Sequence, residues 1–204
     1  MEKYSQSDFI SVINSLLLLV DYQTKKIEGI QSGDRSGIVE AIVASAKAAA
    51  ILNVPVVFTS AEGDGSGEYM RELTSILPKQ DVIKRNYIHT GAFGDEGVSN
   101  NIRKYGRDKI IISGLWTSES FTETAIQALM QGYDVYGLID ACGDTSNERH
   151  NFGVNRMLKA GVTPITWMSL VSDWMNEWAD PTAGEISEEV SGKFNTMLSY
   201  LSKH

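Results

Sequence analysis

Six short apolar runs are spaced along the chain, and amphipathic segments separate them. Each run is a near-continuous series of aliphatic or aromatic residues rather than an alternation of polar and apolar positions. This pattern is typical of strands that are buried on both faces, as in a parallel sheet covered by helices. The sequence therefore predicts strands at Leu16–Val20, Val54–Thr59, Asp81–Ile83, Lys109–Ser113, Tyr133–Ile139 and Thr163–Trp167.

The amphipathic segments between the strands predict helices. Two of these segments are followed by a glycine, Gly132 and Gly161, which is the residue that most often ends a helix. The alternation of strand and helix favours an α/β fold of three layers, in which a doubly wound, Rossmann-like parallel sheet of six strands lies between two layers of helices. The predicted helices are Gly37–Leu52, Glu68–Leu77, Gly97–Gly106, Phe121–Gln131 and Ser146–Ala160.

The segment 168–204 differs from the rest of the chain. Its sequence predicts two helices separated by "ADPTAGE", with aromatic and methionine residues and no further strand for them to cover. Such a C-terminal helical extension either packs on its own domain or contacts another subunit. Because no repeat or second domain is evident, we expect residues 1–204 to form one domain whose tail contributes to a homo-oligomer.

The charge balance limits the classes of partner. The chain has 204 residues, with 26 acidic and 18 basic side chains, and its formal net charge is −8. This charge argues against nucleic acid or an anionic membrane as a partner, because both bind a basic surface. The most apolar run, "SLLLLV", is too short to span a bilayer. The single cysteine, Cys142, excludes an internal disulfide and suits a reducing compartment, so we expect a cytoplasmic protein.

Polar residues follow several of the predicted strands. Asp21 comes after the first strand, and Lys84 and Arg85 come after the third. Ser120 lies in the loop "GLWTSES" after the fourth strand. Ligands in an open parallel sheet bind outside the carboxyl ends of the strands. An acid, a cation and a hydroxyl are therefore expected to converge on one edge of the sheet.

Each of these residues also has an ordinary structural explanation. An aspartate at a strand end often caps a turn, and Lys84 and Arg85 could be solvated loop charges. Ser120 could be the N-cap of a helix that begins at Phe121, because "SFTE" places Glu123 where a capping box requires it. A helix N-terminus also stabilises an anion or a developing oxyanion, so capping does not exclude a functional role.

Several motifs carry a family resemblance. "LLLLVDYQ" looks like the first strand and catalytic aspartate of the isochorismatase-like cysteine hydrolase superfamily, which includes nicotinamidases. "GLWTSESFTETA" matches that superfamily's pattern Gly-x-x-Thr-x-x-Cys-x-x-x-Thr-Ala at Gly114, Thr117, Thr124 and Ala125. The "GLWT" turn, "AGVTPITW" and "DWMNEW" are most similar to its branch of octameric hydrolases. The resemblance extends over nearly the whole chain.

The resemblance implies a catalytic role for each polar residue at the sheet edge. Asp21 would be the base, and Arg85 would be the cation that accompanies it. Lys84 is the alternative cation, because a shift of one residue turns a side chain to the other face of a strand. Ser120 stands where the family has its nucleophilic cysteine.

The resemblance also implies an oxyanion hole and a substrate pocket. The backbone N–H groups of Trp116 and Ser120 would form the oxyanion hole, next to a cis peptide bond between Leu115 and Trp116. Gln23, Phe93 and Thr117 would line the pocket.

Metals and cofactors are not expected. The loop after the second strand lacks the histidines of the nicotinamidase metal site, and His89, His150 and His204 are scattered. Cys142 is either a substitute nucleophile or a small buried apolar residue. The second interpretation is favoured, because no basic residue stands next to Cys142 to activate its thiol.

Three hypotheses for the function remain open, because a serine hydroxyl is a far weaker acid than a thiol and serine nucleophiles usually depend on a histidine. The first is a divergent hydrolase of a small amide or related C–N substrate, with Ser120 as the nucleophile or as the residue that positions water. The second is a non-covalent reaction led by Asp21, as in true isochorismatases. The third is a catalytically silent oligomer that binds a small molecule or a protein.

Overall fold

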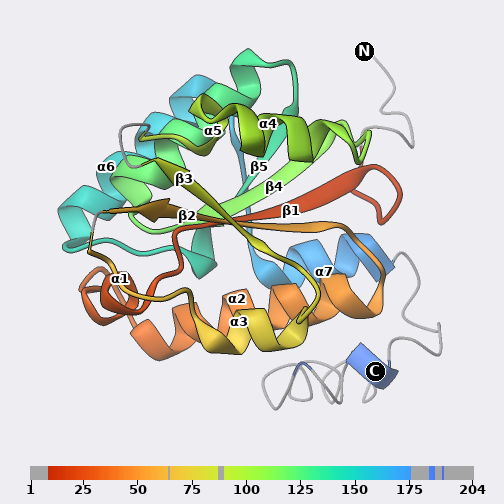
Figure 1. The fold of residues 1–204 in the computed structure, drawn as a ribbon, viewed down its shortest axis with the longest axis horizontal. Coiled ribbons are helices and arrows are strands. Elements are labelled where there is room, and N and C mark those ends of the chain that lie inside the picture. The colour runs from red at the N-terminus through yellow and green to blue at the C-terminus, as the bar shows by residue number, and fades with distance from the viewer. Residues whose placement is uncertain (1–8, 64, 87–89, 176–183, 187–189, 191–204) are drawn as a thin grey trace, which may run out of the picture.

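A parallel sheet of six strands forms the centre of the computed structural model, which describes residues 9–63, 65–86, 90–175, 184–186 and 190 (Figure 1). The strand order is β3-β2-β1-β4-β5-β6, so the direction of winding reverses between β1 and β4. The predicted doubly wound α/β fold is confirmed. The strands are β1 (Ser15–Val20), β2 (Val56–Glu62), β3 (Val82–Asn86), β4 (Lys109–Gly114), β5 (Asp134–Leu138) and β6 (Thr163–Ile165).

Helices cover both faces of this sheet. In Figure 1, α2, α3 and α7 lie below the sheet, and α4, α5 and α6 lie above it. The described helices are α1 (Thr24–Glu28), α2 (Arg35–Ile51), α3 (Arg71–Ile76), α4 (Glu96–Arg103), α5 (Thr122–Met130), α6 (Asn147–Ala160) and α7 (Trp167–Met175). Three short helical turns, η2 (Ala92–Gly94), η3 (Thr117–Phe121) and η4 (Ile139–Ala141), follow the ends of strands or precede helices.

The central strand β1 contributes to the core on both faces of the sheet. All six of its residues are buried. Leu17 and Leu19 pack with apolar residues of α2, α3 and α7, whereas Leu18 and Val20 pack with those of α4, α5 and α6. Successive side chains of a strand point to opposite faces, so a central strand covered on both sides has no position for a solvated residue. This is why β1 is continuously apolar in sequence.

Several element boundaries differ from the prediction. β3 does not end at Ile83 but continues to Asn86, because its residues stay paired with β2 as far as Glu62. β6 ends at Ile165, and Trp167 instead begins α7, where its N–H donates to the Asp140 carboxylate (3.0 and 3.2 Å). Helix α1 was not predicted, since five residues are too few to show an apolar period.

The C-terminal extension is described only in part. Its first helix, α7, buries Leu170, Val171 and Trp174 in the core of its own domain. Trp174 Nε1 also donates a hydrogen bond to Ser15 Oγ at the start of β1 (2.9 Å). The second helix predicted for this extension lies largely outside the described residues. No helix in the described part of the chain is both long and apolar enough to cross a membrane.

Strand register places the candidate residues at one edge of the sheet. Val20 at the end of β1 lies opposite Thr59 of β2 and Gly114 of β4. The segments that follow β1 and β4 therefore leave the sheet side by side, at the point where the winding reverses. In doubly wound sheets this is the usual place for a ligand.

Candidate active site

Asp21 has an unusual backbone conformation directly after β1. Its φ of 60° lies in the left-handed region, which non-glycine residues seldom adopt. The backbone is held there by two hydrogen bonds, from Asp21 N–H to the Thr59 carbonyl and from Gln23 N–H to the Asp21 carbonyl (both 2.8 Å). Such local strain persists where the surrounding structure fixes it, and it is concentrated at functional sites.

The Asp21 carboxylate is fully buried and accepts three hydrogen bonds. Oδ2 accepts from Arg85 at 2.5 Å and from Lys26 Nζ at 3.0 Å, and Oδ1 accepts from the Ala61 N–H at 3.0 Å. The side chains of Asp21, Arg85 and Lys26 have relative exposures of 0%, 1% and 9%. Charge-assisted hydrogen bonds of this kind are short and strong, and burial removes the competition from water. The carboxylate is thus held in a single orientation.

The register of β3 decides which of the two adjacent cations belongs to this site. Arg85 lies opposite Ala61 of β2 and turns its guanidinium to Asp21. Lys84 turns to the other face, where its exposed ammonium pairs with Glu62 (3.1 Å). The alternative assignment of Lys84 to the site is therefore wrong, because adjacent residues of a strand face opposite sides.

Lys26 also belongs to this cluster, although the sequence alone does not point to it. It lies on the short helix α1, which begins three residues after Asp21 and returns the chain toward the end of β1. Lys26 is buried, whereas the neighbouring Lys25 is exposed. Nothing about the adjacent lysines "KK" in the sequence identifies one of them as buried. The burial of Lys26 becomes evident only from the way α1 packs in the structure.

Ser120 lies within the π-helical turn η3, not at a helix N-cap. Helix α5 begins at Thr122, and no side chain caps its first turn. Glu123 pairs with Arg156 of α6 (2.6 Å) instead of returning to Ser120, so the predicted capping box is wrong. The peptide bond between Leu115 and Trp116 is cis. The expected cis bond therefore precedes the turn that carries Ser120.

Ser120 is half-buried, and its hydroxyl is not bonded to Asp21. Among the described residues, Ser120 Oγ has no hydrogen-bond partner, and neither does the Trp116 N–H. The Ser120 carbonyl accepts from Thr124 Oγ1 (2.5 Å), which in turn accepts from the Ala92 N–H (2.9 Å). This pair of bonds joins the turn after β4 to the loop after β3. The structure thus brings Asp21 and Arg85 into contact, and Ser120 emerges from the neighbouring strand β4.

Asp144, three residues before α6, and Arg149, in the first turn of α6, hold the η3 turn in place. The buried carboxylate of Asp144 accepts from the Ser118 N–H at 2.8 Å and from Arg149 Nε at 2.9 Å. Arg149 also pairs with Glu119 of the turn. Burial alone would raise the pKa of the Asp144 carboxyl, but these hydrogen bonds outweigh burial and lower it. Asp144 therefore carries its charge at neutral pH, where it anchors the Ser118 N–H of the turn.

His150 contacts this turn, and its titration is expected to make the stability of the protein dependent on pH. Its Nδ1 lies 3.0 Å from Thr117 Oγ1, and burial lowers the pKa of the imidazole, although the nearby Asp144 opposes the shift. A lowered pKa means that the unfolded chain binds this proton more readily than the folded protein does. The free energy of unfolding should therefore decrease as pH falls below about 6.5.

We expect the change His150→Gln to remove part of this decrease. Urea unfolding at pH 7.5 and at about pH 5.5 measures it, and the difference between the two values should be smaller in the variant than in the unmodified protein. Asp144 titrates at more acidic pH and should add its own loss only there. Equal pH dependence in the two proteins would contradict the assignment to His150.

Cys142 is not a substitute nucleophile. Its side chain is buried, and its Sγ donates to the Ile139 carbonyl (3.2 Å). Burial raises the pKa of the thiol to about 12, so almost no thiolate forms at neutral pH. The interpretation of Cys142 as a small buried residue agrees with this environment.

The residues predicted to line the substrate pocket have different environments. Gln23 lines a polar cavity of about 610 Å³ beneath the glycine-rich loop after β2, together with Glu62 and Lys84. Phe93 and Thr117 are buried, and the Thr117 hydroxyl is engaged by His150. Gln23 Nε2 donates to two backbone carbonyls, while its Oε1 is buried without a partner among the described residues.

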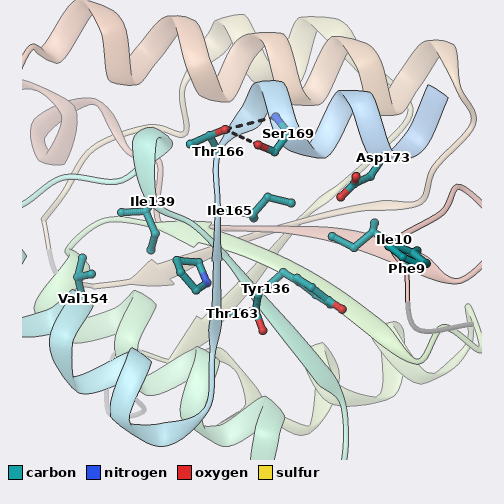
Figure 2. A pocket seen from close by; sticks show the side chains of 11 residues that line it. Phe9, Ile10, Tyr136, Ile139, Val154, Thr163, Ile165, Thr166, Ser169 and Asp173 are labelled. Atoms are coloured by element: carbon teal, nitrogen blue, oxygen red, sulfur yellow. Dashed lines mark hydrogen bonds between the residues drawn. The ribbon is translucent and has the colours of Figure 1, made fainter. Parts of the chain in front are cut away.

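A second cavity lies far along the sheet from Asp21. It has a volume of about 450 Å³ and lies beside the edge strand β6, between α6 and α7 (Figure 2). Its wall is largely apolar, with Ile10, Tyr136 and Ile165 facing the space and Asp173 at one end. None of the predicted site residues lines it. Within the described residues, no three His, Cys, Asp or Glu side chains are grouped as metal ligands.

Comparisons with known proteins agree with this architecture. The isochorismatase domain family matches residues 15–169. The protein "Probable hydrolase YcaC" of Escherichia coli (strain K12) is 23% identical over 191 residues, which span 92% of this chain and 91% of that protein.

Two solved structures have the same fold, each with a TM-score of 0.88. YcaC from Pseudomonas aeruginosa, solved with hexane-2,5-diol and covalent acrylamide, is 21% identical, and the match covers 98% of this chain and 100% of that one. The YcaC gene product of Escherichia coli, described as an octameric hydrolase of unknown specificity, is 22% identical, with 100% of both chains covered.

Proposed function

The chain belongs to the isochorismatase family, and from this membership we propose that it is a hydrolase of small molecules with Asp21, Arg85 and Ser120 at its active site. The buried ion pair between Asp21 and Arg85 is the observation that carries the proposal. The Asp21 backbone is strained, and the side chains of both residues are buried. The pair also lies at the switch point of a doubly wound sheet. Buried, paired charges at such a place in the fold are common at active sites.

The proposed substrate is a small amide or a related compound with a C–N bond. Ser120 Oγ attacks the carbonyl carbon, and Asp21 accepts the hydroxyl proton. The C–N bond then breaks, and the nitrogen leaves with that proton as ammonia or an amine. Water next attacks the acyl ester on Ser120, which releases the carboxylic acid and restores the hydroxyl. Arg85 holds the Asp21 carboxyl group in its orientation throughout.

An oxyanion hole next to Ser120 would support this chemistry. The Trp116 N–H is free of any partner among the described residues, and α5 begins two residues after Ser120. Backbone N–H groups and the positive end of a helix dipole stabilise the negative oxygen of a tetrahedral intermediate. We propose that the N–H groups of Trp116 and Ser120 serve this purpose.

One observation favours a second candidate, a non-covalent reaction led by Asp21. Ser120 Oγ is not hydrogen-bonded to the Asp21 carboxylate, whereas a serine nucleophile is normally bonded to its base. In that reaction Asp21 would transfer a proton to or from a bound substrate, and Ser120 would only orient substrate or water.

Variants of Ser120 distinguish these candidates. Ammonia release from a panel of small amides and ureas should detect turnover by the unmodified protein, and Ser120→Ala should reduce it at least about a hundredfold if Ser120 is the nucleophile. Ser118→Ala is the matched control from the same turn, and it should leave the rate nearly unchanged. Turnover that survives Ser120→Ala and disappears in Asp21→Asn would instead establish the Asp21-led reaction. Absence of turnover with every amide would contradict the proposed substrate class.

We further propose that the protein acts in the cytoplasm as a homo-oligomer. The octameric state described for the Escherichia coli YcaC gene product supports a homo-oligomer, since the two chains match over their full lengths. The acidic net charge, which disfavours nucleic acid and anionic membranes, is consistent with a small-molecule substrate.

A further inference from the structure

We infer that Lys26 is a positioning residue of the active site, a second cation that holds the Asp21 carboxylate and favours negative charge on the group at position 120. This inference rests on the proposed function and adds a residue to it. Lys26 Nζ donates to Asp21 Oδ2, the same oxygen that accepts from Arg85. The base is therefore bracketed by two cations from different elements, α1 and β3.

The burial of Lys26 is fixed by the backbone around α1. The N–H groups of Thr24 and Lys25 donate to the carbonyls of Glu68 and Ser66, at 2.9 and 3.1 Å. Gln23 Nε2, just before the helix, donates to the Gly67 carbonyl (3.1 Å). These bonds dock α1 against the glycine-rich loop, so that one lysine of the pair faces inward and the other faces solvent.

A purely structural ion pair does not require this lysine. Asp21 and Arg85 already form a pair with balanced charge. Removal of an ammonium from water is unfavourable, and a second cation on the same oxygen is repelled by the first. Lys26 adds positive potential beside Asp21. That potential stabilises an anion that forms next to the carboxylate, as in the attack by residue 120.

The reactivity of a thiol introduced at position 120 measures this potential, and the measurement does not require the substrate to be known. In the variant Ser120→Cys, the sulfur attacks the methylene carbon of iodoacetamide and iodide leaves, at a rate set by the fraction of thiolate. The unmodified protein is the blank, because the buried Cys142 has a thiol pKa of about 12. Peptide mass analysis assigns the alkylated residue.

Loss of Lys26 should slow this alkylation. In the Ser120→Cys background we expect Lys26→Met to lower the second-order rate about tenfold at pH 7, as when a thiolate loses one neighbouring cation. Lys26→Arg should restore most of the rate. Lys25→Met is the matched control, because this exposed neighbour lies on the same helix and should leave the rate unchanged.

The outcomes separate this inference from the proposed function. A reactive thiol at position 120 whose rate is the same with and without Lys26 would overturn the role of Lys26 and leave the proposed site intact. Reduced thermal stability without a change in rate would mean that Lys26 is only structural, which also overturns the role. A thiol at this position that is unreactive in every background would overturn both. Lys26→Met leaves Asp21 paired with Arg85 and should fold, and Lys26→Gln is the second variant if it does not.

Discussion

Replacement of Asp21 by asparagine is expected to lower the free energy of unfolding by about 3–5 kcal/mol, because it leaves two buried cations without the carboxylate that they share. Arg85 and Lys26 both donate to Asp21 Oδ2, and all three side chains are buried. Asparagine has nearly the same shape as aspartate but no charge. The loss therefore measures the electrostatic role of the carboxylate rather than its packing.

Two comparisons make this expectation specific. Asp34→Asn is the control, because Asp34 is an exposed N-cap of α2 and asparagine caps helices equally well, so the change should stay within about 0.5 kcal/mol. Arg85→Met should destabilise the protein less than Asp21→Asn does, since Asp21 keeps Lys26 as its partner. Urea unfolding at pH 7 measures all three variants. A loss below about 1 kcal/mol for Asp21→Asn would show that the cluster does not hold a buried charge as described.

The sheet could be predicted from the sequence because burial on both faces leaves a simple signature. All residues of β1 and β4 are buried, and the centre of each strand is a run of aliphatic residues, a pattern that has few other structural explanations. The convergence of Asp21 and Arg85 follows from the same topology, since parallel strands end at a common edge. The choice between Arg85 and Lys84 depends on the register of β3 with β2. A shift of one residue would turn Lys84, instead of Arg85, toward Asp21.

Other parts of the site depend on interactions that leave no periodic signal. Lys26 becomes part of the cluster only through the docking of α1, a helix too short to predict. Ser120 and Glu123 have the spacing of a capping box, but η3 adds a turn before α5, and Glu123 is drawn to Arg156 of α6. At β6, the apolar run through Trp167 suggests a longer strand. In the structure, helix α7 begins at Trp167, whose N–H donates to the Asp140 carboxylate. In each case a contact distant in sequence overrides the local pattern.

The packing of α6 on the η3 turn leads to a further expectation: Gly153→Ala should destabilise the protein by about 1–3 kcal/mol. A Cβ atom at Gly153 would lie 2.7 Å from the Ser118 Cα and 2.8 Å from both the Ser118 nitrogen and the Thr117 carbonyl oxygen. All three are backbone atoms, so no side-chain rotation can relieve the overlap. Glycine is therefore required at this position by the close approach of α6 to the turn.

The sign of this effect distinguishes it from ordinary helix propensity. In the middle of an unconstrained helix, alanine is more stable than glycine by about 1 kcal/mol. The control Asn155→Ala, at an exposed position of the same helix, should be neutral or slightly stabilising. Thermal or urea unfolding compares the two variants, and an equally stable or more stable Gly153→Ala protein would contradict the close contact.

The same variant tests whether the turn positions residue 120. The methyl group would push α6 away from Ser118, and the bonds that Asp144 and Arg149 make to the turn depend on that approach. In the Ser120→Cys background, Gly153→Ala should therefore change the rate at which iodoacetamide alkylates the introduced thiol, whereas Asn155→Ala should not. A Cβ at Gly153 would meet backbone atoms of the turn rather than a charged residue of the Asp21 cluster. A changed rate would therefore show that the position of residue 120 had changed. An unchanged rate in a destabilised protein would mean that the turn keeps its geometry without the support of α6.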